Sequence, residues 1–183
     1  KSLNVKRIPD YKPRSKELTK GLQLIYDHLY NVWCSKNKEL FEYVLNWLAC
    51  TFAGRKLRIC IYSTCTERCG RGIIINFINC ILGNAMYKTS STEVIEKWTK
   101  PFEGCMLLNF DEMPLDGTNY RSIADRLKSL ISEPTFDCRS MRENPYTQKN
   151  TFNIMLTSNN DAVLLTQSNN KRYVILDIDE SLS

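Results

Sequence analysis

The sequence is poor in histidine and has no long apolar run. His28 is the single histidine among 183 residues, and the eight cysteines form no pair of Cys-x-x-Cys motifs. A structural zinc site draws its ligands from closely spaced Cys and His residues, so this composition argues against a zinc-binding domain. No apolar stretch approaches the roughly 20 residues of a membrane-spanning helix. The polar start, residues 1–7, also lacks the apolar segment of a secretory signal. We therefore expect no membrane association.

The cysteines favour a reduced, intracellular chain. Five of them, Cys34, Cys50, Cys60, Cys80 and Cys105, lie in apolar helix or strand patterns. In such places a free cysteine behaves as a small hydrophobic residue. Two others, at positions 65 and 69, lie in a turn before an expected helix, whose N-terminus could lower a thiol pKa and favour oxidation there.

Length and charge indicate one globular domain with a mild basic excess. Apolar residues make up 43% of the chain and charged residues 25%, which is ordinary for a globular protein. Lys and Arg number 25 against 20 Asp and Glu, which fits nucleic-acid contact without requiring it, since a solvated basic surface explains it equally well. The absence of an initiator Met suggests a piece of a longer chain or a processed one.

The apolar periodicity predicts an α/β fold in which two helices precede a core with a central, mostly parallel sheet. We expect a linker or arm over residues 1–14, a helical segment over 15–55 and the core over 56–183. Ser90 and Glu93 have the spacing of a capping box, which predicts a helix through Trp98. Expected strands cover residues 57–62, 85–89, 105–112, 151–156 and 172–177, and a polar hairpin covers 133–150.

Residues 57–82 have the layout of a phosphate-binding loop. An alternating strand over 57–62 is followed by a turn of small and polar residues and then by a helix with an apolar stripe. Within the turn, Gly70 alone matches the G-x-x-x-x-G-K-[ST] pattern outright. The residues we expect to contact a nucleotide are Cys65, Thr66, Glu67, Arg68, Cys69, Gly70, Arg71 and Gly72.

Further along the chain, polar residues stand at strand ends and supply the other groups that triphosphate chemistry requires. Gly70 allows close approach of backbone to phosphate, and Asp111 is a candidate ligand for Mg²⁺. Glu112 could polarise water, and Asn159 could hold the attacking water or the γ-phosphate. Arg172 could reach a neighbouring subunit as an arginine finger. Each of these residues singly is also explained as an ordinary turn, strand end or surface charge.

Taken together, these segments resemble the superfamily 3 helicase domain of viral and phage primase-helicases, over about residues 40–177. The matching segments are residues 65–78 (Walker A and the helix after it), 106–112 (Walker B), 130–134 with the basic stretch that follows, 154–159 (sensor Asn) and 171–174 (arginine finger). The resemblance implies an AAA+-like P-loop NTPase core, ATP and Mg²⁺ as cofactors, a hexameric ring of identical chains, and movement along single-stranded DNA. It also implies a primase or polymerase domain in the same longer chain, and a location in host cytoplasm or nucleus if the chain is viral.

The Walker A segment departs from the family pattern. Cys65 and Arg68 stand where the family has Gly, and Arg71 stands in place of the lysine that reaches the phosphates. Arginine keeps the charge but is planar and bulkier. Gly72 supplies no hydroxyl for magnesium. Weak or absent hydrolysis is therefore an open alternative.

For DNA, the resemblance points to Arg139, Arg142 and Lys149 as backbone contacts inside the ring, with Tyr146 available for stacking. An exposed basic hairpin without a ligand is the competing interpretation. Three functions stay open: an ATP-dependent DNA helicase domain of a viral or mobile-element replication protein, a hydrolysis-impaired nucleotide- or DNA-binding scaffold of the same fold, and a non-catalytic interaction module of a larger complex.

Overall fold

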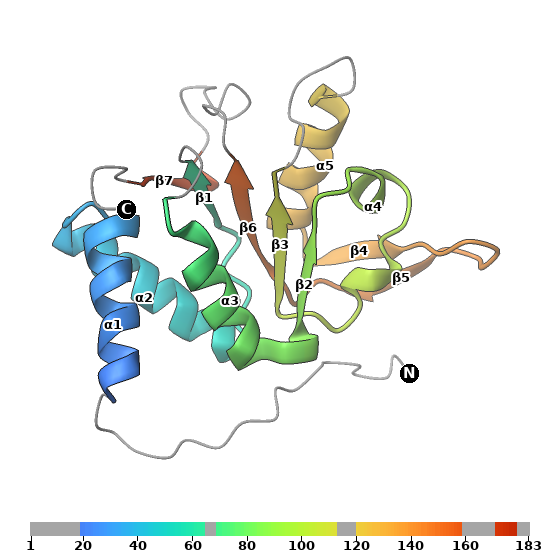
Figure 1. Ribbon diagram of the computed structural model, residues 1–183. Helices are drawn as coiled ribbons and strands as arrows, with labels where there is room; N and C mark the ends of the chain where they lie inside the picture. The colour runs from blue at the N-terminus through green and yellow to red at the C-terminus, as the bar shows by residue number, and fades with distance from the viewer. Residues whose placement is uncertain (1–18, 65–68, 113–119, 159–170, 179–183) are drawn as a thin grey trace.

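A five-stranded parallel sheet forms the centre of the molecule (Figure 1). The computed structural model describes residues 19–64, 69–112, 120–158 and 171–178. The strand order is β2-β3-β6-β1-β7. Their bounds are β1 (Cys60–Thr64), β2 (Met86–Thr89), β3 (Leu107–Asp111), β6 (Asn153–Ser158) and β7 (Tyr173–Asp177). The predicted α/β class with a central parallel sheet is confirmed.

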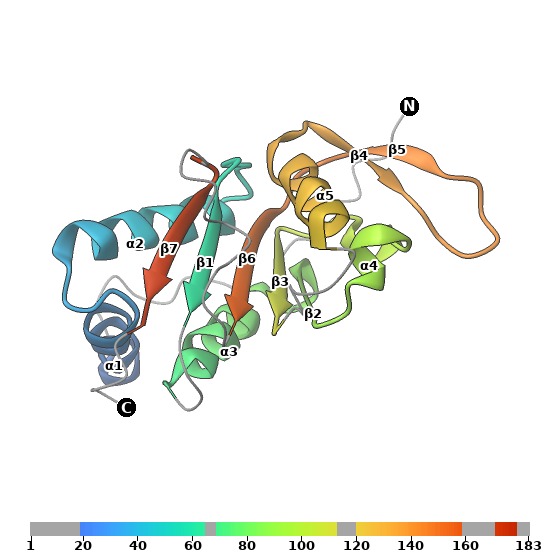
Figure 2. The same ribbon diagram turned by 90° about the horizontal axis from the view of Figure 1, so that it is seen from above.

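Helices pack against both faces of this sheet (Figures 1 and 2). One face is covered by α1 (Lys20–His28), the π-helical turn η1 (Leu29–Trp33), α2 (Lys38–Phe52) and α3 (Arg71–Leu82). The other face packs against α5 (Tyr120–Ser132) and the antiparallel hairpin of β4 (Thr135–Cys138) and β5 (Tyr146–Lys149). Short elements complete the described chain: η2 (Gly83–Ala85), α4 (Glu93–Glu96) and η3 (Lys100–Phe102).

Two apolar cores follow from the alternation of side chains along buried strands. On β1, Ile61 belongs to the core beneath α1, α2 and α3, whereas its neighbour Tyr62 belongs to the core beneath α5. Successive residues of a strand point to opposite faces, so a strand with helices on both sides must be apolar throughout. This explains why the central strands are recognisable as short continuous apolar runs.

The predicted helices before the first strand are present. Thr19 caps α1 by accepting a hydrogen bond from the Leu22 amide (3.3 Å), and Asn37 caps α2 by accepting one from the Leu40 amide (3.1 Å). Side chains of this type satisfy amides that a helix leaves unpaired at its first turn. None of the described helices combines the length and apolar character that a membrane crossing requires.

The first strand begins later than predicted. The sequence pattern placed it over residues 57–62, but β1 spans Cys60–Thr64. Arg58 has a φ of +57°, which is incompatible with an extended strand, and the Leu57 amide donates to the Asn153 side chain (2.8 Å) instead of to a neighbouring strand. The strand gains Ser63 and Thr64 at its other end because β6 and β7 flank it there.

The helix predicted from Ser90 to beyond Trp98 is wrong in both start and length. Helix α4 spans only Glu93–Glu96, and its N-cap residue, Thr92, makes no side-chain capping bond. The Thr89 hydroxyl instead accepts from the Ser91 amide (3.1 Å), which holds a turn at this point. The Ser-x-x-Glu spacing is therefore not a capping box here.

The Lys56 amine is partly buried beside the start of β6. Its Nζ donates to the carbonyls of Leu130 (2.9 Å) and Phe152 (2.8 Å) and lies 4.9 Å from the centre of the Phe152 ring. Burial lowers the pKa of this amine to about 7, with a smaller effect in the same direction from the charge of Arg58 and an opposing one from Cys60. The folded state therefore favours the neutral amine above neutral pH.

This lowered pKa predicts that stability rises with pH above neutrality. Between the folded pKa of about 7 and the unfolded value of 10.5, the unfolded chain binds more protons than the folded chain. The free energy of unfolding should rise by roughly 1.5 kcal/mol from pH 7 to 8.5 relative to Lys56→Met, which lacks the amine. Urea unfolding of both proteins across this range measures the difference. Parallel pH curves would show that Lys56 titrates normally.

Candidate functional site

The site expected at the end of β1 is built around the start of α3. Gly70 precedes α3 with a φ of +73°, a left-handed conformation that favours glycine. Helix α3 then buries Ile74, Ile75 and Ile78 against the sheet, which fixes the helix direction. Its N-terminus lies at the carboxyl ends of the strands, at the upper side of Figure 1. The unpaired amides and the dipole of a helix N-terminus favour anions.

The strand register aligns three polar residues at this edge of the sheet. Asp111 of β3 pairs with Thr157 of β6, and Thr157 pairs with Ser63 of β1. Paired residues on parallel strands share a face, and this is the face that α3 covers. All three lie at or near the carboxyl ends of their strands, where ligands of open α/β sheets bind. The Ser63 hydroxyl is buried and has no partner among the described residues.

Asp111 is the most constrained member of this row. Its Oδ1 accepts a hydrogen bond from the Thr157 hydroxyl (2.6 Å), and its Oδ2 lies 2.8 Å from Nζ of Lys88 on β2. Partial burial by itself would raise the pKa of Asp111. The bonds from Lys88 and Thr157 and the charges of Lys88 and Arg71 outweigh burial and lower the pKa. The carboxylate is therefore ionised at neutral pH.

Arg71 turns inward over the row. Its Nη1 donates to the carbonyl of Ser158 (2.8 Å), and its Nη2 lies 3.8 Å from both the Asp111 and the Glu112 carboxylates. The Arg71 side chain is only 11% exposed, whereas that of Glu112 is 61% exposed. Glu112 has a φ of +49° and donates its amide to the Thr157 carbonyl (2.9 Å). A strained backbone of this kind is often found at functional sites.

The donor set at this edge suits a hard divalent cation. Magnesium is bound in proteins by one or two carboxylates together with water and phosphate oxygens. Asp111 provides an ionised carboxylate, and the Glu112 carboxylate lies beside the same Arg71 nitrogen. The residues present therefore fit magnesium, and Asp111 is the residue that would hold it.

Helix α1 contacts the turn before α3 through the single histidine. Nε2 of His28 donates to the Gly70 carbonyl over 3.0 Å. A Cβ at position 70 would lie 2.6 Å from the Cε1 atom of His28, so the ring and the glycine are packed without space between them. The helical segment before the core thus contributes directly to the geometry of the site.

The structure places the other expected nucleotide-site residues unevenly. Cys69, Gly70, Arg71 and Gly72 are at the start of α3, and Asp111 and Glu112 are beside Arg71. Residues 65–68 and Asn159 lie outside the described residues. Arg172 lies just before β7, at the opposite end of the strands from Asp111, and its Nε donates to the Ser132 hydroxyl (2.7 Å). Arg172 therefore does not reach the site of its own chain.

The residues expected to contact DNA lie on the β4–β5 hairpin, which projects from the sheet (Figure 2). Arg139 follows β4, and its guanidinium donates to Asp137 (3.1 Å). Arg142 is exposed in the connecting loop with a φ of +65°. Lys149 is exposed but pairs with Thr135 at the other end of the hairpin. The structure thus brings Arg139 and Arg142 near each other and separates Lys149 from them.

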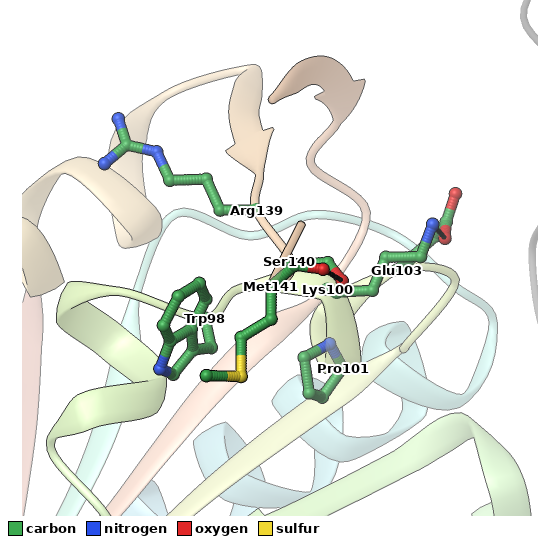
Figure 3. Close-up of a pocket in the computed structure, with 7 residues that line it drawn as sticks. All are labelled: Trp98, Lys100, Pro101, Glu103, Arg139, Ser140 and Met141. Atoms are coloured by element: carbon green, nitrogen blue, oxygen red, sulfur yellow. Dashed lines mark hydrogen bonds and ion pairs between the residues drawn. The ribbon is translucent and has the colours of Figure 1, made fainter. Parts of the chain in front are cut away.

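A pocket of about 450 Å³ lies beside the hairpin (Figure 3). Met141 reaches toward the indole ring of Trp98, while the Arg139 side chain points away from the pocket. At the hairpin, Nζ of Lys100 contacts the Tyr146 hydroxyl (2.7 Å), so the aromatic ring considered for base stacking already has a cation against it. The pocket is lined by Trp98, Lys100, Pro101, Glu103, Arg139, Ser140 and Met141.

Sequence reasoning did not assign Lys88, Ser63 or His28 to the site. Lys88 and Ser63 belong to unremarkable strand patterns, and His28 to a helical one. Their contacts depend on which strands are neighbours and on how α1 packs, neither of which a local pattern reveals. One signal could have indicated Lys88. It is a basic residue near the end of a predicted strand, and the next predicted strand ends in acidic residues.

Comparison with solved structures shows that this chain shares its fold with other proteins, among them a helicase. Two structures of the NrS-1 C-terminal region superpose with TM-scores of 0.74 and 0.79, at 14% and 16% identity, over 97% and 92% of this chain. A JCV helicase structure superposes with a TM-score of 0.56 at 11% identity over 86% of this chain. These identities show a shared fold. The chain spans 40% and 42% of the NrS-1 chains and 45% of the JCV helicase chain.

The family assignment is direct. The family of unknown function DUF5906 matches residues 64–172, which is more than half of the chain. The chain belongs to this family. Among curated proteins, no significant match is found.

The contact between His28 and Gly70 predicts how substitutions at position 70 behave. Gly70→Ala should destabilise the protein by about 1–3 kcal/mol, because it combines a left-handed backbone with a clash. Adding His28→Ala should relieve the clash, so the double variant should lose less than the sum of the single variants.

Gly72→Ala is the matched control, since a Cβ at this position meets no atom within 4 Å beyond its chain neighbours and the backbone of its own helix. It should be neutral or slightly stabilising, because alanine is the better helix former. Chemical denaturation of the four variants measures these effects. Strict additivity between positions 28 and 70 would contradict the packing described above.

Proposed function

We propose that this chain is the ATP-binding and ATP-hydrolysing domain of a DNA helicase that is part of a longer viral or mobile-element replication protein. The observation that carries the proposal is the convergence of Arg71, Asp111 and Glu112 at the N-terminus of α3. A charged cluster at this edge of a helicase-like sheet is suited to a triphosphate with its divalent ion.

Each described residue then has a role. The first-turn amides of α3 contact the phosphates, and Arg71 contributes positive charge beside them. Asp111 holds magnesium, which when bound shields phosphate charge and orients the phosphate chain. Glu112, exposed at the edge of the site, orients the attacking water. For Asn159, the role assigned from the sequence, contact with that water or the γ-phosphate, remains part of the proposal.

A ring of identical chains, hexameric by resemblance, accounts for Arg172. Within one chain this residue lies at the amino end of the strands, whereas Asp111 lies at their carboxyl end. An arginine finger must therefore be supplied across an interface between copies. Its Nε donates to Ser132 Oγ, a neutral acceptor, whereas a phosphate of an adjacent protomer would offer a charged one.

The projecting hairpin is the part that we assign to single-stranded DNA. Arg139 and Arg142 lie at its distal part, and phosphate contacts of this kind follow a strand without reading its sequence. Lys149, at the base of the hairpin, would contact a more distant part of the strand.

A second function is favoured by a specific observation. The Arg71 guanidinium is engaged by the Ser158 carbonyl and two carboxylates, and it is mostly buried. Removing it from these contacts to meet a phosphate has a free-energy cost. A scaffold that binds nucleotide or DNA but turns over slowly is therefore the competing proposal.

ATPase assays test the first proposal. The chain should hydrolyse ATP in a magnesium-dependent manner, and Asp111→Asn should lower the rate about 100-fold or more because the magnesium ligand is lost. Asp125→Asn is the matched control, since its carboxylate also pairs with a lysine but on α5, which covers the other face of the sheet. Equal rates for Asp111→Asn and the parent would contradict the assignment.

The same assay separates the two proposals through Arg71→Lys. A large gain in the variant, together with no turnover in the parent, would favour the impaired scaffold. Turnover in the parent would favour the helicase domain.

Single-strand binding should depend on salt through the hairpin. Arg142→Ala should weaken binding of a labelled oligo-dT and reduce the slope of log affinity against log salt by about 0.7, as expected for one lost phosphate contact. Lys38→Ala, at an exposed position of α2, should change neither quantity. Fluorescence anisotropy over a range of salt concentrations gives both. Identical slopes for Arg142→Ala and the parent would exclude this hairpin as the DNA contact.

A further inference from the structure

Among the described residues of the site, Lys88 is the cation that stands on the edge strand β2. It pairs in register with Asn109 of β3, so its side chain lies on the same face as Asp111. Its Nζ reaches Asp111 Oδ2 at 2.8 Å, and half of its side chain is exposed. Arg71, in contrast, is 11% exposed and bound to a main-chain carbonyl. Of the two cations, Lys88 is the one that can leave its partner for solvent or a ligand.

The charges of the described cluster cancel. Arg71 and Lys88 contribute two positive charges, and Asp111 and Glu112 contribute two negative charges. A divalent ion bound at Asp111 would leave this cluster with an excess of two positive charges. A triphosphate without its metal ion carries about four negative charges, so this excess offsets about half of them. Lys88 would meet the remaining negative charge by turning from the carboxylate to the phosphates.

We propose that Lys88 is a phosphate-binding residue of this site, which holds Asp111 in the absence of ligand and moves to the phosphate chain when a divalent cation takes its place at Asp111. The inference rests on the proposed nucleotide-binding function. A lysine suits this exchange because its compact ammonium sits on a flexible stem, whereas the planar guanidinium of Arg71 is fixed by several bonds.

The exchange means that Lys88 should weaken the binding of the metal ion alone and strengthen the binding of the nucleotide. Without nucleotide, the ammonium and a divalent cation compete for the same carboxylate oxygen. With nucleotide, the ammonium adds a charge-assisted hydrogen bond to phosphate. Loss of Lys88 should therefore affect the two ligands in opposite directions, which a merely structural role would not do.

The experiment uses two probes, Mn²⁺ alone followed by electron paramagnetic resonance, and a fluorescent ATP analogue with Mg²⁺ followed by anisotropy. In Lys88→Met, affinity for Mn²⁺ without nucleotide should rise about threefold or more, and affinity for the ATP analogue should fall about tenfold or more. Lys88→Arg should retain most of the nucleotide affinity. Lys97→Met, which removes another half-exposed, ion-paired lysine, should change neither affinity.

Weakening of both ligands in Lys88→Met would show that Lys88 only braces Asp111, and would overturn the proposal. Unchanged affinities for both would overturn it as well. If the parent protein binds no ATP analogue under conditions where its fold is intact, the proposed nucleotide-binding function fails. Normal binding by the parent and by Lys88→Met alike would remove only the role of Lys88.

Discussion

The site depends on the two interactions that hold the Asp111 carboxylate. The carboxylate accepts a hydrogen bond from the Thr157 hydroxyl (2.6 Å) on one neighbouring strand and forms an ion pair with the Lys88 ammonium (2.8 Å) on the other. Both partners are available because β3 lies between β6 and β2, all three strands running in the same direction. The sheet order thus determines the chemistry at this edge. A different neighbour on either side would leave a half-buried charge without compensation.

The second constraint is the junction before α3. The left-handed Gly70 directs the helix so that its N-terminus and Arg71 lie over the row of Asp111, Thr157 and Ser63. His28 packs on that glycine from α1. The helices before the core are therefore part of the site's support. Among the described residues, the result is a cluster in which two positive and two negative side chains neutralise one another.

Local sequence patterns were sufficient for the elements whose burial is uniform. The central strands are short apolar runs and α2 has a clear apolar stripe, so both were predictable. Predictions failed where a local turn or a left-handed residue interrupts the expected element. Arg58 breaks the expected start of β1 through its backbone conformation, and Thr89 takes the place of the expected capping box before α4.

For the site, the sequence indicated Gly70, Arg71, Asp111 and Glu112, which the structure brings together, because strand-end positions are local properties. The ion pair of Lys88 with Asp111 and the contact of His28 with Gly70 join segments far apart in sequence, and no periodicity encodes them. Arg172 was predicted to act from a neighbouring copy. It lies at the amino end of the strands, away from the Asp111 of its own chain, so its action on another copy stays a proposal.

The most direct measurement of the central claim is a crystal structure of the chain with a non-hydrolysable ATP analogue and Mg²⁺. The account predicts phosphates at the N-terminus of α3 and the metal ion at Asp111. Nucleotide bound at another surface, or a metal ion held away from Asp111, would contradict it.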